Sequence, residues 1–152
     1  MRRRLGAVSL RLYAAPSYLE NHTAPQSPAD LADHNCLRYA NSSWGDEWHF
    51  IDAGGALVKT RVSGSLTTNY VQTIRAAGAA GIGLVLMSPV TISDLVASGA
   101  LVPVMPGYRT REFEINALYP HRRHMTAKLR IFLDMLVARF ADERWWLDSA
   151  AD

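Results

Sequence analysis

The chain has 152 residues, of which 49% are hydrophobic and 20% are charged, with 16 basic and 14 acidic side chains and a formal net charge of +2. This composition excludes a disordered chain, fits one compact domain with an apolar core, and shows neither a long basic stripe for nucleic acid nor the roughly 20 apolar residues of a membrane span. A single cysteine excludes an internal disulfide framework and fits a reducing compartment, so we expect a cytoplasmic protein.

The first forty residues are predicted to hold a strand and two short helices. Residues 10–15 alternate loosely and stop at Pro16, which indicates a strand that enters a turn, and residues 17–21 form a short helical turn. In Ser27-Pro28-Ala29-Asp30 a capping residue precedes proline at the first helical position and an acid at the third. This pattern predicts a short helix that ends near His34.

The next segment is predicted to contain three strands. Residues 36–40 and 48–52 have strand patterns, and Ala53-Gly54-Gly55 turns the second of them into a strand over residues 57–62 as a hairpin. We expect these three strands to form one antiparallel or mixed patch.

A helix followed by a buried strand comes next. Thr68 or Asn69 is expected to cap a helix that has Val71, Ile74 and either Ala77 or Gly78 on one face. Residues 82–87 then form a continuous apolar run that suits a strand buried on both sides, and this succession favours an α/β fold.

The C-terminal third is predicted to hold two more helices and two more strands. Residues 91–98 form a short helix closed by Gly99, and residues 101–104 form a strand that Pro103 places at a sheet edge. Alternation over residues 113–119 predicts a strand that stops at Pro120, and apolar residues at helical spacing predict an amphipathic helix over residues 126–140. The tail, with Trp145 and Trp146, is expected to be a frayed end or a docking segment.

A series of short motifs follows the order typical of one family. Ala15-Pro16-x-Tyr18-Leu19, Pro25, Pro28-x-Asp30-Leu31 and His34-x-Cys36-Leu37 together resemble the effector-binding domain of LysR-type transcriptional regulators. The later landmarks agree in order: Trp48-x-Phe50, Gly64-x-Leu66-x-x-Asn69, Gly81-x-Gly83, Gly99-x-Leu101-Val102, Tyr119-Pro120 and Phe132. Each motif is weak by itself, but their shared order over about 130 residues makes the match strong.

The resemblance implies an α/β sandwich like the type II periplasmic binding proteins, in which two subdomains joined by two crossover strands enclose a cleft for a small effector. Residues 1–12 would be a remnant of subdomain I, residues 13–111 the complete subdomain II, residues 112–141 the return crossover strand and closing helix of subdomain I, and residues 142–152 a tail. The one complete subdomain plus part of a second would leave an apolar face uncovered, so we expect self-association as a homodimer or larger. DNA would be bound only through a helix-turn-helix domain that has no counterpart here.

The predicted ligand-binding residues are Thr67, Thr68, Asn69, Pro16 and Ser88. The first three offer side-chain donors beside free backbone N–H groups at a helix start, which suits a carboxylate or another small anion. Plain N-capping by Thr68 or Asn69 is the alternative, and the two roles can coexist. The resemblance places Ser88 beside the cleft, at a position where the family usually has a proline.

Two other patterns favour structural roles over nucleotide or metal binding. The pair Gly81-x-Gly83 precedes a strand, whereas the dinucleotide fingerprint follows one, so we expect a tight turn and close helix-to-strand packing. His121 and His124 lie near Glu112 and Glu114 in sequence, but no fixed tetrahedral set is implied. We expect no metal and no cofactor.

A catalytic role is also disfavoured. His34 and Cys36 could form a nucleophile pair, but no third residue orients them, and a buried thiol with a capping histidine is the preferred interpretation. Trp44, Trp48 and Phe50 are interpreted as hydrophobic cover on the sheet. The expected function is therefore that of a ligand-sensing regulatory domain without catalytic residues, and the alternative is a stand-alone solute-binding or protein-interaction module without a transcriptional role.

Overall fold

The computed structural model describes residues 1–120 and 126–141 of the chain. Its elements, in chain order, are β1 (Arg2–Val8), β2 (Arg11–Ala14), α1 (Pro16–Leu19), the 3₁₀ helix η1 (Pro28–Asp33), β3 (Cys36–Tyr39), β4 (Glu47–Ile51), β5 (Leu57–Arg61), β6 (Thr67–Thr68), α2 (Val71–Ala79), β7 (Leu84–Met87), α3 (Pro89–Ala97), β8 (Val102–Val104), β9 (Phe113–Leu118) and α4 (Ala127–Ala141). The helices and strands predicted from the sequence occur in the predicted order, and the structure adds two strands that the local patterns did not predict, β1 and β6.

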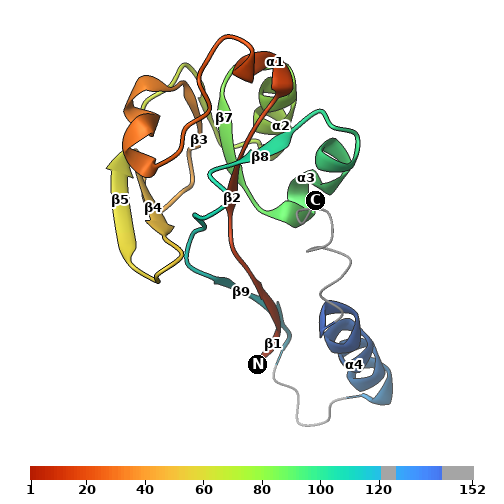
Figure 1. Cartoon of the computed structure of the whole chain (residues 1–152). Coiled ribbons are helices and arrows are strands. Elements are labelled where there is room, and N and C mark those ends of the chain that lie inside the picture. The colour runs from red at the N-terminus through yellow and green to blue at the C-terminus, as the bar shows by residue number, and fades with distance from the viewer. Residues whose placement is uncertain (121–125, 142–152) are drawn as a thin grey trace.

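A five-stranded sheet forms the centre of the molecule, in the order β6-β3-β7-β2-β8 (Figure 1). Strand β3 runs parallel to β6 and β7, whereas β2 runs antiparallel to β7 and β8. The edge position predicted for the strand that contains Pro103 is confirmed.

Both faces of this sheet are buried because successive residues of its strands point to opposite sides. In β7, Leu84 belongs to the core on the side of the β4–β5 hairpin, and Val85 belongs to the core under α2 and α3. In β2, Leu12 belongs to the core on the hairpin side and Tyr13 belongs to the core under the two helices. The prediction of a central strand buried on both sides is therefore confirmed.

The predicted three-stranded patch is wrong. Strands β4 and β5 form a two-stranded antiparallel hairpin by themselves, while β3 pairs with β6 and β7 in the central sheet. Long-range partners satisfy the backbone groups of β3, which sequence neighbours could not reveal. Trp48 and Phe50 of β4 are 4% and 0% exposed, which confirms that they cover the sheet.

The starts of the two helices that flank β7 differ from the prediction. Thr68 is held extended by its parallel pairing with Tyr39, so α2 begins later and its N-cap is Tyr70. The Thr68 hydroxyl instead accepts the backbone N–H of Tyr70 at 3.1 Å. Helix α3 begins earlier, at Pro89, because the Ser88 hydroxyl caps it.

The tight turn expected at Gly81 is confirmed, whereas the close packing at Gly83 is between strands and not between a helix and a strand. Gly81 has a φ of +77°, which glycine adopts at little cost. Gly83 lies so close to β3 that a β-carbon there would stand 2.2 Å from the carbonyl oxygen of Asn35. Only a residue without a side chain fits this approach between neighbouring strands.

Strands β1 and β9 pair antiparallel from Arg2↔Leu118 to Val8↔Phe113 and form a separate β1–β9 ribbon beside α4 (Figure 1). Arg3 on the ribbon binds the Asp134 carboxylate of α4 at 2.7 Å. Two crossover segments, residues 9–10 and 105–112, join the ribbon to the central sheet. They are tied together by Thr110, which is fully buried and whose hydroxyl accepts the Leu10 N–H at 2.8 Å.

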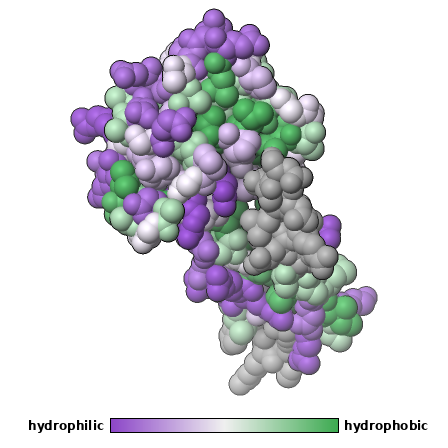
Figure 2. All heavy atoms as spheres, in the orientation of Figure 1, coloured by the Kyte–Doolittle hydropathy of each residue, from purple (hydrophilic) through white to green (hydrophobic). Residues whose placement is uncertain are grey.

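Helix α4 leaves part of its apolar surface uncovered, as expected. Leu133 is buried, but Ile131, Phe132 and Met135 are 68%, 50% and 59% exposed. Figure 2 shows hydrophobic and hydrophilic residues side by side on this helix. Among the described residues, no helix combines the length and apolar character needed to cross a bilayer.

Candidate ligand-binding site

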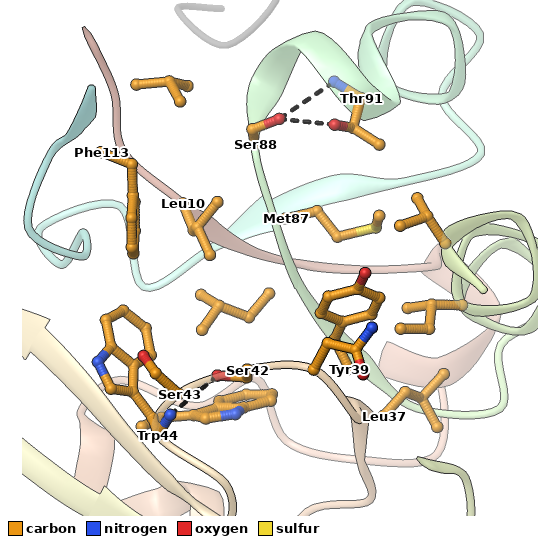
Figure 3. A pocket seen from close by; sticks show the side chains of 16 residues that line it. Leu10, Leu37, Tyr39, Ser42, Ser43, Trp44, Met87, Ser88, Thr91 and Phe113 are labelled. Atoms are coloured by element: carbon orange, nitrogen blue, oxygen red, sulfur yellow. Dashed lines mark hydrogen bonds between the residues drawn. The ribbon is translucent and has the colours of Figure 1, made fainter. Parts of the chain in front are cut away.

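A cavity of about 450 Å³ opens where the central sheet meets the β1–β9 ribbon (Figure 3). This volume lies within the roughly 300–1,000 Å³ range of small-molecule sites. Its walls come from the central sheet with its helices, from the β1–β9 ribbon and from the loop after β3. The lining residues are Val8, Leu10, Leu37, Tyr39, Asn41, Ser42, Ser43, Trp44, Trp48, Val71, Ile74, Leu86, Met87, Ser88, Thr91 and Phe113.

The cavity lies at the carboxyl ends of the parallel strands. Residues 41–44 follow the end of β3, and Ser88 follows the end of β7. In open α/β sheets this edge carries ligand sites, because loops leave the strands there and helices begin there with free backbone N–H groups. Val8, Leu10 and Phe113 close the cavity from the ribbon and the first crossover segment.

Aromatic rings form one side of the cavity. The Trp44 indole stacks on His49 with a centroid distance of 5.2 Å and meets the Phe113 ring at 5.5 Å with a tilt of 48°. The Arg111 guanidinium lies 5.6 Å from the centre of the same Phe113 ring. Because Trp44 follows β3 and Phe113 begins β9, this contact joins the central part of the fold to the ribbon (Figure 3).

Hydroxyl groups form another side. The Ser88 and Thr91 hydroxyl oxygens lie 2.6 Å apart, and Ser88 Oγ also accepts the Thr91 N–H at 3.3 Å (Figure 3). Within residues 1–120 and 126–141, no side chain that lines the cavity carries a charge at neutral pH. The site therefore offers aromatic and aliphatic surface with a few hydrogen-bonding groups.

The structure brings one predicted site residue into the cavity wall. Ser88 lines it. Thr67 and Thr68 form β6 and Asn69 follows this strand, and all three lie outside the lining. Pro16 follows the end of β2, which runs the other way, so it lies at the opposite edge. Ligand contact at these five positions stays a prediction, and the geometry favours Ser88 over Pro16.

The histidine and cysteine weighed as a nucleophile pair do not bond to each other. His34 Nδ1 is 2.8 Å from the Tyr18 hydroxyl, and the nearest polar partner of Cys36 Sγ is the Leu31 carbonyl at 3.8 Å. Burial raises the pKa of the Cys36 thiol to about 12, and burial, followed by the neighbouring His22, lowers the pKa of His34. A neutral thiol and a neutral imidazole with separate partners match the structural interpretation.

Among the described residues no cluster of three potential metal ligands occurs. His121 and His124, as well as Trp145 and Trp146, lie outside the described residues.

Comparison with known proteins identifies the family. Residues 2–141 match the family model of the LysR substrate binding domain. The chain belongs to this family. Its α/β fold is accordingly that of LysR regulatory domains, with the periplasmic-binding-protein-like architecture that was expected.

Curated relatives agree with this assignment. The chain is 29% identical over 135 residues to the uncharacterized HTH-type transcriptional regulator YhjC of Escherichia coli, covering 88% of this chain and 45% of that protein. It is 31% identical over 128 residues to the HTH-type transcriptional regulator CrgA of Neisseria meningitidis, covering 84% of this chain and 42% of CrgA. The chain thus spans less than half the length of these relatives.

Solved structures show the same fold. The regulatory domain of AphB from Vibrio vulnificus, treated with cumene hydroperoxide, superposes with a TM-score of 0.78 at 31% identity, covering 91% of this chain and 68% of that one. CrgA from Neisseria meningitidis, a LysR-type transcriptional regulator, gives a TM-score of 0.77 at 29% identity, covering 93% of this chain and 48% of CrgA.

Most cavity residues were not singled out from the sequence. The sequence indicates Trp44 as cover on the sheet and Phe113 only as the start of a strand, because their contact joins segments almost seventy residues apart. One signal was available: Asn41-Ser42-Ser43-Trp44 is a polar and aromatic loop directly after a strand that enters the parallel sheet.

Proposed function

We propose that this chain is the ligand-sensing part of a LysR-type transcriptional regulator and that a small effector binds in the cavity between the central sheet and the β1–β9 ribbon. The observation that carries the proposal is that this cavity draws its walls from both sides of the crossover segments. The proposal assigns sensing, and not DNA contact, to these 152 residues. The subdomain boundaries predicted at residues 12 and 111 are part of it.

The mechanism follows from the position of the cavity. A ligand that touches Phe113 on the ribbon and Met87 on the central sheet stabilises one arrangement of the two parts over others. A ligand shifts such an equilibrium only by its difference in affinity for the two arrangements. Sensing therefore requires ligand contacts with residues on both walls, whereas binding itself does not.

Two measurements test this proposal. Isothermal titration with a panel of small acids and neutral molecules should find a ligand whose affinity falls when Ser88 is changed to Ala, whereas Ser98→Ala, at the other end of α3 and outside the cavity, should bind normally. The double variant Thr68→Ala, Asn69→Ala tests the predicted anion contact. Saturating ligand should also slow hydrogen exchange of the Leu10 amide in the crossover segment, and unchanged exchange with full binding would show that the chain binds without sensing.

Self-association belongs to the same proposal. The exposed side chains Ile131, Phe132 and Met135 form an apolar surface on α4 that a second copy of the chain would cover. Size-exclusion chromatography with light scattering should give a dimer or larger species, and Ile131→Lys with Met135→Lys should shift it to monomer. A monomer at all concentrations for the unmodified chain would contradict this part.

A further inference from the structure

The lining of the cavity specifies the chemistry of the effector more closely than the sequence does, which predicts only a small anion. We infer that the effector carries a flat aromatic ring, which packs against Trp44 and Phe113, and that a single small polar group of the effector points toward Ser88 and Thr91. This inference rests on the proposed ligand-sensing function and concerns the substrate class of the same site.

The first argument is the composition of the walls. Trp44, Trp48, Tyr39 and Phe113 all line the cavity, and the remaining lining is aliphatic apart from a few hydroxyl and amide groups. Aromatic pairs gain energy beyond the burial of area when ring centres lie about 4.5–7 Å apart in offset or tilted arrangements. The Trp44 and Phe113 rings, tilted at 48°, present such surfaces to a third ring (Figure 3).

The second argument is charge. Among the described residues that line the cavity there is no lysine, arginine or histidine to pair with an anion, and no acid to pair with a cation. Arg111 lies over Phe113 but is not part of the lining. A ligand with two or more charges would lose its hydration without a partner charge, which is costly. The body of the effector is therefore uncharged.

The third argument is the position of the polar groups. The Ser88 and Thr91 hydroxyls lie together at the start of α3, and both residues line the cavity. They can hydrogen-bond a hydroxyl, an amide or one carboxylate. The ring and the polar group of the effector thus contact different walls of one cavity. A single charge on the effector is allowed but not required.

Four probes separate ring, charge and apolar volume: benzyl alcohol, benzoate, cyclohexylmethanol and succinate. Titration followed by NMR should show benzyl alcohol and benzoate binding about tenfold more tightly than cyclohexylmethanol, because each aromatic pair adds to the burial of area. Succinate should not bind. The two aromatic probes should also produce a ring-current shift of the Trp44 indole N–H signal, assigned with Trp44→Phe, which cyclohexylmethanol cannot produce.

A matched pair of variants locates the effect. Phe113→Leu keeps an apolar side chain and should weaken the aromatic probes about fivefold to tenfold, while Tyr70→Leu removes an exposed ring outside the cavity and should change nothing. Should Phe113→Leu not fold, the Trp44 signal of the unmodified protein still decides the question.

The outcomes separate this inference from the proposed function. If cyclohexylmethanol or succinate binds at the cavity as tightly as the aromatic probes, or if neither aromatic probe binds, the aromatic assignment is overturned. A non-aromatic effector found in the broader panel, with affinity dependent on Ser88, would leave the sensing function standing. Failure of every compound in both sets would instead remove the sensing function together with the assignment.

Discussion

The only cysteine of the chain should be almost unreactive while the protein is folded. Cys36 is 0% exposed, and burial raises the pKa of its thiol from 9.0 to about 12. Alkylating reagents attack the thiolate. At pH 8 the thiolate fraction falls from about one in ten to about one in ten thousand, so the folded protein should react roughly a thousandfold more slowly than the unfolded chain.

Iodoacetamide labelling at pH 8, followed by mass spectrometry, measures this ratio directly, because the chain has one site. The control is the double variant Cys36→Ala, Ala53→Cys, which moves the thiol to an exposed turn and should react at the rate of the unfolded chain. Native labelling of Cys36 within a factor of ten of this control would refute the buried-thiol reasoning and would reopen a reactive role for the residue.

The same shift has a consequence for stability at high pH. Well below pH 9 the thiol keeps its proton in both the folded and the unfolded state and contributes almost no pH dependence. Between pH 9 and about 12 the unfolded chain loses the proton first, so it binds fewer protons and the free energy of unfolding falls by up to about 1.4 kcal/mol per unit. Urea denaturation at several pH values should show this decline, and Cys36→Ala should lack that part of it. Parallel profiles for both proteins would count against the shift.

Two further substitutions test positions that hold the site together. Gly83→Ala should lower the free energy of unfolding by roughly 1–3 kcal/mol in urea denaturation, because the new β-carbon would stand 2.2 Å from the Asn35 carbonyl oxygen. Gly107→Ala is the control: its new β-carbon would have no atom within 4 Å, so the free energy of unfolding should change by no more than about 0.5 kcal/mol. Equal losses in the two variants would contradict the packing argument. Thr110→Val should cost roughly 1–3 kcal/mol and speed hydrogen exchange at Leu10, because the partly buried Leu10 N–H loses its acceptor. Thr110→Ser keeps the hydroxyl, and no difference between the two variants would show that this hydrogen bond is unimportant.

Local patterns predicted the elements of this fold well. The cap at Ser27, the proline after it and Asp30 specify the start of η1, and the Asp30 carboxylate accepts the Ser27 N–H at 2.9 Å. The apolar run of β7 predicts burial on both faces, because a strand covered on one side only would alternate. Such signals lie within a few residues of each other, so a sequence displays them.

Pairing over long distances was less predictable. The partners of β3 are β6 and β7, and nothing in residues 36–40 indicates that choice over the nearer β4. The candidate site depends on the same kind of information, since Trp44 meets Phe113 only after two crossover segments have brought the ribbon to the sheet. Ser88 could be predicted because it adjoins a recognisable strand, whereas the aromatic wall of the cavity could not be predicted.

The β1–β9 ribbon also constrains the order of events during synthesis. Arg2 pairs with Leu118, so the pairing of β1 with β9 cannot form until more than a hundred further residues have been made, which takes on the order of 10 s at the usual rate of translation. An unpaired strand edge invites association with other chains. Three consecutive arginines, Arg2 to Arg4, occupy the first half of this strand, and like charges on neighbouring nascent chains repel. The three arginines of β1 can thus limit association of the growing chain with other chains before β9 is made.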